Sequence, residues 1–159
     1  MTEKFRVLFV CTGNICRSPL AEGYFRHLVE IEKLSDIEAD SAGIGALPGS
    51  PPSLEAIAVA EDCEFDISSL KSRRLRKNDL EDFDLLLVMT NEQRDWILKT
   101  FSADKTKIKL LREFAGEKSH IEIPDPIGMS ISSYKIVFLT IKRSVDGLIK
   151  HIVSERALI

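Results

Sequence analysis

The chain has 159 residues, of which 44% are apolar and 30% are charged, and its formal net charge is -3. This length and apolar content suffice for one well-buried core but are short for two, so we expect a single domain over residues 1–159. A small acidic excess argues against a general nucleic-acid-binding protein, so no nucleic-acid partner is expected.

The cysteines and the hydropathy pattern indicate the cellular compartment in which the protein is expected. The chain has three cysteines, an odd number. It shows no signal-peptide pattern and no apolar run of about 18 residues, the length that a membrane helix needs. Free thiols in a reducing cytoplasm are therefore expected, with no membrane partner.

The first predicted elements are a strand and a helix. Residues 5–10 are almost continuously apolar, which is typical of a central parallel strand. A helix is predicted from Pro19 to about Lys33, because proline suits a first helical turn and apolar residues recur with helical spacing. Its buried side is expected to carry Ala21, Phe25 and Leu28.

Further strands and helices alternate along the rest of the chain. The predicted strands lie at 37–41, 85–89 and 107–111, and a helix is predicted at 53–62. A Gly/Pro-rich loop at 43–52 would lie over the loop after the first strand. A capping box of Thr90 and Gln93 predicts the start of another helix.

The C-terminal segment predicts a long amphipathic helix. Apolar residues recur there in steps of three and four, a helical period. This stripe could form a dimer seam, but packing against the sheet is favoured, so a monomer is expected. The stripe consists of Ile131, Tyr134, Phe138, Ile141, Val145, Leu148 and Ile152.

Alternating strands and helices predict an α/β fold. We expect a three-layer sandwich, with a four-stranded parallel sheet, helices on both faces and a phosphate-binding loop after the first strand. Ligands of such sheets bind beyond the carboxyl ends of the strands. Cys11 lies at such an end.

The loop after the first strand carries residues suited to phosphate chemistry. Backbone N–H groups of a tight loop and of a helix start form a nest for an oxyanion. A free cysteine has a pKa of about 8.5, which a helix N-terminus and an arginine lower, so Cys11 is expected to be a nucleophilic thiolate. Arg17 supplies a planar fork for two phosphoryl oxygens. Substrate-binding contacts are expected from Thr12, Gly13, Asn14, Ile15, Cys16 and Ser18.

Other loop chemistries fit the spacing less well. A nucleotide-binding P-loop needs a second glycine followed by lysine and Ser/Thr, and a thioredoxin centre needs two cysteines separated by two residues. Cys63 stands alone, and the histidines show no ligand spacing. No metal and no cofactor are therefore expected.

The Cys-x5-Arg-Ser loop at the N-terminus and the later pair Asp125-Pro126 make the chain resemble the low-molecular-weight protein tyrosine phosphatase family over nearly its whole length. Residues 40–43 and 87–90 also resemble family positions. The resemblance implies hydrolysis of phosphotyrosine monoesters through a cysteinyl-phosphate intermediate. Its substrates would be a phosphorylated protein or a small aryl phosphate, and its product inorganic phosphate.

Asp125 would be the general acid and then the base of this reaction. Cleavage of a phosphate ester needs a proton for the departing oxygen, and hydrolysis of the phosphocysteine needs a base to activate water. One carboxyl can do both. Glu113, Glu117 and Glu122 are neighbouring alternatives that match no family motif.

Several positions depart from the tyrosine-directed pattern. Ile127 and Gly128 stand where those members commonly have aromatic residues, and Leu70 stands where many have a histidine linked to the loop asparagine. The pair Ile127-Gly128 and the Ser-rich stretch after it resemble the arginine-directed branch of the family, whereas Leu70 implies only that the support of Asn14 differs. That branch, however, carries a threonine at the position of Ile15. The aliphatic side chain of Ile15 offers no acceptor to a guanidinium, which favours phosphotyrosine.

Three alternative functions remain open. One is a protein arginine phosphatase of the same family. Another is a thiol-coupled arsenate reductase, which would need resolving cysteines where only Cys63 is available. The third is a non-catalytic phosphate-binding module. The basic segment 71–77, with five basic residues in seven, is expected to be a solvated surface rather than a surface that steers substrates.

Overall fold

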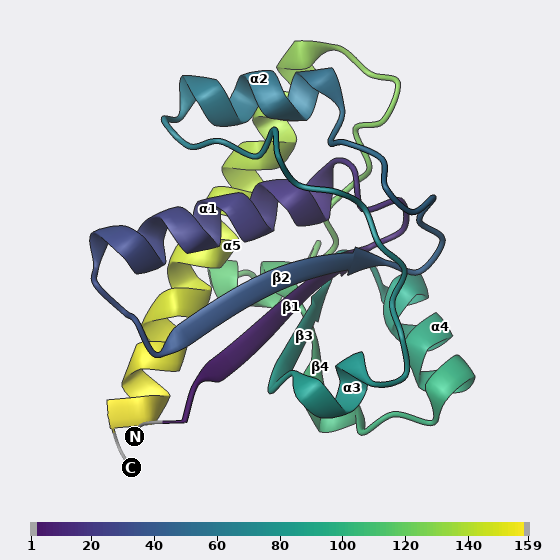
Figure 1. The fold of residues 1–159 in the computed structure, drawn as a ribbon, viewed down its shortest axis with the longest axis vertical. Helices are drawn as coiled ribbons and strands as arrows, with labels where there is room; N and C mark the ends of the chain where they lie inside the picture. Colours follow the sequence, from purple (N-terminus) through teal and green to yellow (C-terminus); the bar gives the residue numbers. More distant parts are fainter. Residues whose placement is uncertain (1–2, 158–159) are drawn as a thin grey trace.

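The computed structural model describes residues 3–157, and it contains a four-stranded sheet in the order β2-β1-β3-β4 (Figure 1). All three strand pairs are parallel, as predicted. The central position of β1 explains its continuous apolar run, because both of its faces and both of its edges are covered. The strands are β1 (Phe5–Cys11), β2 (Ile37–Gly43), β3 (Leu85–Val88) and β4 (Ile108–Leu110).

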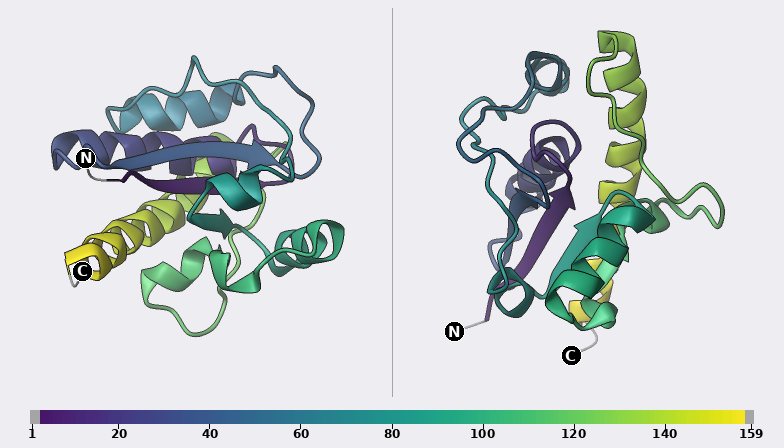
Figure 2. Two further views of the ribbon diagram at one scale, coloured as in Figure 1. Left: turned by 60° about the horizontal axis from the view of Figure 1, so that its bottom comes forward. Right: turned by 90° about the vertical axis from the view of Figure 1, so that its right-hand side faces the viewer.

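Helices connect the strands and cover both faces of the sheet (Figure 1, Figure 2). The short helix α3 and two 3-10 turns were not predicted, because elements of three to five residues carry too little periodicity. The helical elements are α1 (Arg17–Ile31), α2 (Leu54–Asp62), α3 (Asp79–Asp82), α4 (Asn91–Phe101) and α5 (Ile131–Ala157), with the 3-10 turns η1 (Lys105–Lys107) and η2 (Leu111–Ala115).

The sheet has an apolar core on each of its faces. Each core joins the sheet to a layer of helices, which gives three layers. Side chains alternate along β1. Val7 and Phe9 enter the core shared with α1, α2 and α5, whereas Leu8 and Val10 enter the core shared with α4. The predicted three-layer sandwich is therefore confirmed.

Helix α1 begins and ends two residues before its predicted bounds. The first helical bond runs from Leu20 N–H to the carbonyl of Cys16, so Pro19 lies within the first turn. The first N–H groups of a helix have no partner inside it, so proline is tolerated throughout that turn and does not mark its first residue. At the other end, Lys33 has a left-handed backbone (φ 57°), which stops the helix.

The predicted capping box at the start of α4 is confirmed. The Thr90 hydroxyl accepts the N–H of Gln93, and the Gln93 side-chain carbonyl accepts the N–H of Thr90 at 3.1 Å. The same carbonyl accepts the N–H of Met89, and the amide nitrogen donates to the hydroxyl of Thr12 at 3.1 Å. The cap therefore also ties α4 to the loop that follows β1.

The apolar stripe of α5 is covered within the chain. Its predicted members are buried in the core with α1 and α2, except Ile131, which is 41% exposed at the first residue of the helix. The stripe is thus not a dimer seam. Within residues 3–157, none of the helices combines the length and apolar content needed to span a membrane.

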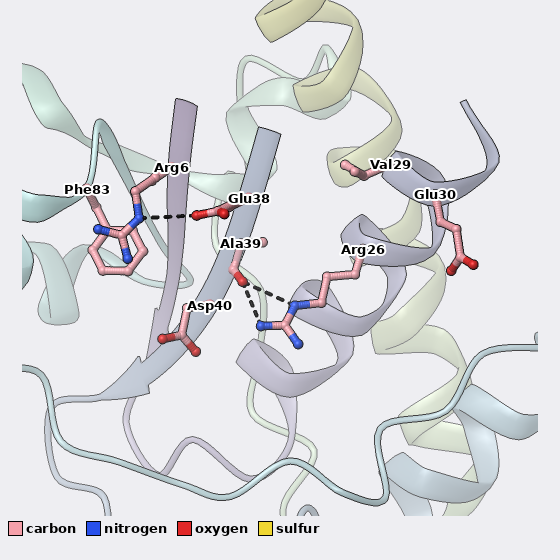
Figure 3. Close-up of a pocket in the computed structure, with 8 residues that line it drawn as sticks. All are labelled: Arg6, Arg26, Val29, Glu30, Glu38, Ala39, Asp40 and Phe83. Carbon is pink, nitrogen blue, oxygen red and sulfur yellow. Dashed lines mark hydrogen bonds and ion pairs between the residues drawn. The ribbon is translucent and has the colours of Figure 1, made fainter. Parts of the chain in front are cut away.

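The outer edge of β2 is closed by side chains (Figure 3). The carbonyl of Ala39 accepts two N–H groups of Arg26, at 2.8 and 3.1 Å, and the N–H of Ser41 donates to the carboxylate of Asp40. An edge strand with free polar groups can pair with another chain. Arg26 and Asp40 occupy these groups instead, beside a groove of about 480 Å³.

We predict that Gly147→Ala in α5 costs about 3 kcal/mol or more of unfolding free energy. A Cβ at Gly147 would overlap the main-chain oxygen of Phe114, which moves only with η2. Gly23→Ala is the matched control, because the nearest atoms to its Cβ belong to the side chains of Ile67 and Phe65. Urea unfolding measures both variants, and a smaller loss for Gly147→Ala than for Gly23→Ala would contradict the prediction.

Candidate active site

A cavity of about 210 Å³ opens at the carboxyl end of β1. Its floor and walls come from the loop that joins β1 to α1, and one side comes from the loop between η2 and α5. All the predicted site residues except Ser18 line it. The lining residues are Cys11, Thr12, Gly13, Asn14, Ile15, Cys16, Arg17, Asp125 and Ile127.

Cys11 is the last residue of β1 and is almost completely buried. Its sulfur accepts the backbone N–H of Asn14 at 3.3 Å and lies 2.9 Å from the hydroxyl oxygen of Ser18. Ser18 is fully buried behind the sulfur and does not reach the cavity. The sulfur is therefore held between the loop and the first turn of α1.

Asn14 gives the loop its shape. Its backbone is left-handed (φ 57°), a conformation that asparagine tolerates better than most residues. Its side-chain amide donates to the hydroxyls of Ser18 and Ser41, at 2.7 and 2.9 Å, and its carbonyl accepts the N–H of Arg73 at 3.0 Å. The loop is therefore held by three partners from α1, β2 and the segment before α3.

A buried carboxyl continues this network away from the cavity. The Ser41 hydroxyl donates to Glu22 of α1, and Glu22 pairs with Arg26 at 2.8 Å. Burial raises the pKa of the Glu22 carboxyl. Because the Ser41 hydroxyl donates its proton to Glu22, its oxygen can only accept from Asn14. This fixes the orientation of the Asn14 side-chain amide.

Arg17 extends from the first turn of α1 to the cavity wall. It is buried, and one guanidinium nitrogen donates to the carbonyl of Ile123 at 2.9 Å. Another nitrogen lies 3.6 Å from the carboxylate of Asp125. The N–H of Ile123 donates in turn to the carbonyl of Met89 after β3. Arg17 is thus fixed by the main chain and faces the cavity.

Asp125 lies on the exposed side of the cavity, with 45% of its side chain accessible. Its other carboxylate oxygen accepts the N–H of Ile127 at 3.0 Å. The neighbouring glutamates Glu113, Glu117 and Glu122 do not line the cavity. Glu117 pairs instead with Arg112, and of the acids considered from the sequence only Asp125 lines the cavity.

Cys16 faces a different set of groups from those around Cys11. Its sulfur lies 3.2 Å from the hydroxyl of Tyr134 in α5 and 3.5 Å from that of Ser53. Burial raises the pKa of the Cys16 thiol, and it raises the pKa of Tyr134 to about 12. Cys16 is thus held as a neutral thiol at the back of the loop.

One sequence expectation turns out differently in space. The loop at 43–52 is bonded to the start of the phosphate loop, where the N–H groups of Ile44 and Gly45 donate to the carbonyls of Cys11 and Thr12, but none of its residues lines the cavity. Cys63 lines a separate cleft between α2 and α5. Among the described residues, no group of three or more His, Cys, Asp or Glu is arranged to hold a metal.

Sequence reasoning missed Ser41, Glu22, Tyr134 and Arg73, which support the loop from elsewhere in the fold. Ser41 belongs to the stretch 40–43, which resembled family positions without suggesting chemistry. Leu70 forms no hydrogen bond to Asn14, so Asn14 has a different support from the histidine that the resemblance implies. The main-chain N–H of Arg73 provides it.

Known proteins match this arrangement over nearly the whole chain. A low molecular weight protein-tyrosine-phosphatase of Bacillus subtilis, YfkJ, is 35% identical and covers 96% of this chain and 98% of its own. A protein-arginine-phosphatase of Geobacillus stearothermophilus is 32% identical, over 96% of this chain and 99% of its own.

A solved structure shares the fold closely. The YwlE arginine phosphatase, as a cysteine-to-serine mutant with a phosphorylated active site serine, superposes with a TM-score of 0.89 at 30% identity, over 98% of this chain and all of its own. The family model described as low molecular weight phosphotyrosine protein phosphatase matches residues 6–158. The chain belongs to this phosphatase family.

Proposed function

We propose that the chain is a protein tyrosine phosphatase that hydrolyses phosphotyrosine monoesters through a cysteinyl-phosphate intermediate. One observation carries the proposal. The Cys11 sulfur, the Arg17 guanidinium and the Asp125 carboxyl face one cavity at the carboxyl end of β1. A nucleophile, a charge-stabilising group and an acid are what the reaction needs.

In the first step, the Cys11 thiolate attacks phosphorus, and a sulfur–phosphorus bond forms as the phosphorus–oxygen bond to the phenol breaks. Asp125 gives its proton to the departing phenolate oxygen. Arg17 and the loop N–H groups bind the equatorial oxygens, whose charge is spread most widely in the transition state.

In the second step, water attacks the phosphocysteine, and Asp125, now a carboxylate, takes the proton of that water. The sulfur–phosphorus bond breaks, so Cys11 leaves as a thiolate and inorganic phosphate is released. The phosphorylated active site serine of the YwlE mutant supports a phosphoryl group carried on the side chain at this loop. Cys63 lines a different cleft, which weighs against a thiol-coupled arsenate reductase.

The proposal also covers the setting of the enzyme. We place it in the cytoplasm as a single phosphatase domain over residues 1–159, acting as a monomer on a phosphorylated protein or a small aryl phosphate. The three cysteines are free thiols, which suits a reducing compartment, and the apolar stripe of α5 is covered within the chain.

A protein arginine phosphatase is the second candidate. The sequence identity to a relative named protein-arginine-phosphatase favours it, and so does the absence of an aromatic residue at Ile127 on the rim of the cavity. Ile127 is half exposed there and provides no aromatic wall for a tyrosine ring. Against it stands Ile15, which lines the cavity with an aliphatic side chain. A guanidinium bound to phosphorus would bury N–H donors against it without acceptors, at a cost in free energy.

Replacing Cys11 with serine should abolish turnover of p-nitrophenyl phosphate, with a loss of at least about a thousandfold, because a hydroxyl is a poor nucleophile at neutral pH. Inorganic phosphate should still bind, since the loop N–H groups and Arg17 remain; calorimetry measures this. Cys63→Ser is the control and should keep the parental rate. Near-parental turnover of Cys11→Ser would refute the mechanism, and an inactive parent enzyme would favour a non-catalytic binding module.

Asp125→Asn should slow hydrolysis of phosphotyrosine by about a hundredfold or more, because the departing phenolate then lacks its proton donor. Esters with better leaving groups should lose less. Glu122→Gln is the matched control, since it removes a nearby carboxylate that does not line the cavity. Initial rates on the two classes of ester decide the matter, and equal losses on both would make Asp125 a structural residue.

Ile15→Thr should shift the ratio of kcat/KM values for phosphoarginine and phosphotyrosine peptides by about tenfold toward arginine, because a hydroxyl can accept from the guanidinium. The parent enzyme should prefer phosphotyrosine. Inhibition by inorganic phosphate serves as the control and should stay constant, since the loop N–H groups are unchanged. A parent enzyme that prefers phosphoarginine would establish the second candidate instead.

A further inference from the structure

Residues 72–75, in the middle of the basic segment, form a strap across the carboxyl end of β2 (Figure 1). The N–H of Gly43 donates to the carbonyl of Arg73, and the N–H of Leu75 donates back to the carbonyl of Gly43, both at 2.9 Å. The N–H of Arg73 then points to the phosphate loop, where it donates to the Asn14 side-chain carbonyl at 3.0 Å. The strap therefore joins β2 to the residue that shapes the loop.

The strap also holds residues 44–53, the loop that joins β2 to α2. Ser72 exchanges main-chain bonds with this loop, donating to the carbonyl of Ser50 and accepting from Gly49, both at 2.8 Å. Its hydroxyl accepts the N–H of Ser50 and donates to the carbonyl of Leu47. Four residues thus fix two neighbouring loops against each other.

The Arg73 side chain anchors the strap. Its guanidinium pairs with Asp79 at 2.9 Å and with Asp40 at 3.2 Å. Asp79 is almost fully buried at the start of α3, and its carboxylate also accepts the N–H of Arg76. A buried carboxylate needs such a partner. The charge of Arg73 is therefore neutralised within the fold and is not free to steer a substrate.

We propose that Arg73 is a positioning residue for the phosphate loop. Through its pairs with Asp79 and Asp40 it fixes its own N–H against Asn14, and Asn14 in turn keeps its N–H directed at Cys11. The role rests on the proposed phosphatase activity. It assigns an internal function to Arg73 alone, because the other four basic residues of the segment are exposed, as expected from the sequence.

Two substitutions separate positioning from electrostatic steering. Arg73→Gln removes a positive charge, and Asp79→Asn removes a negative one, so steering predicts opposite effects on association with an anionic substrate. Positioning predicts the same effect. Each variant should lower kcat for p-nitrophenyl phosphate by about tenfold, the loss expected for one misplaced hydrogen bond, with a smaller change in KM. Arg73→Lys should recover part of the rate.

Lys71→Gln is the matched control, because it removes a positive charge from the same segment at an exposed side chain outside the strap. It should keep the parental kcat. Thermal unfolding identifies variants that fail to fold, and if Asp79→Asn is one of them, the pair Arg73→Gln and Arg73→Lys decides. A parental kcat for Arg73→Gln, or an equal and salt-dependent loss in Lys71→Gln, would overturn the proposal.

Binding of inorganic phosphate, measured by calorimetry, tests the positioning role without turnover. Arg73→Gln should weaken it several-fold, while Lys71→Gln should not. If the parent protein bound phosphate without hydrolysing p-nitrophenyl phosphate, the proposed function would fail, and the phosphate affinities would still decide the role of Arg73. Equal affinities in the parent and in Arg73→Gln would overturn that role.

Discussion

The left-handed backbone of Asn14 is the constraint on which the site depends. A non-glycine residue with positive φ is strained, and the strain persists only where surrounding contacts determine it. Here three hydrogen bonds to the side chain of Asn14, from α1, β2 and the strap, hold that conformation. The result is that its N–H turns toward the Cys11 sulfur. The strain is thus located where the chemistry needs a preformed nest.

The sheet topology brings these supports together. β1 lies between β2 and β3, so the residues that follow all three strands meet at one edge. β1 contributes Cys11, β2 contributes Ser41 near its end, and the segment after β3 supplies the Met89 carbonyl that holds Ile123, which in turn accepts from Arg17. The α4 cap reaches Thr12 from the same edge. Secondary structure that looks generic in sequence therefore determines the loop geometry.

Features that depend on a few neighbouring residues were predicted from the sequence. The apolar run of β1, the capping box of Thr90 and Gln93 and the Cys-x5-Arg-Ser loop each act over a few residues, and each was found in place. The start of α1 at Arg17 was missed because proline is permitted throughout a first turn. Ile131 fits the apolar period of α5 but lies at its exposed first turn, where periodicity says nothing of burial.

The supports of Asn14 were beyond sequence reasoning for a different reason. Ser41 is 27 residues away along the chain and Arg73 is 59 residues away. Arg73 supports Asn14 with a main-chain N–H, which every residue except proline carries and which leaves no trace in composition. Its side chain was counted as part of a surface charge run, because nothing local shows that Asp40 and Asp79 neutralise it.

The residues that would carry out the reaction and those that would select its substrate lie in different surroundings. The groups that would form and break the bond to phosphorus, apart from Asp125, lie in a buried loop that is supported by the network around Asn14. Ile127, by contrast, is half exposed on the rim and its side chain supports none of these groups. The rim can therefore change without cost to the chemistry below it. Ile15 belongs to both levels, since its carbonyl anchors Ser53 while its side chain faces the cavity, which makes it the position where a change of substrate touches the loop itself.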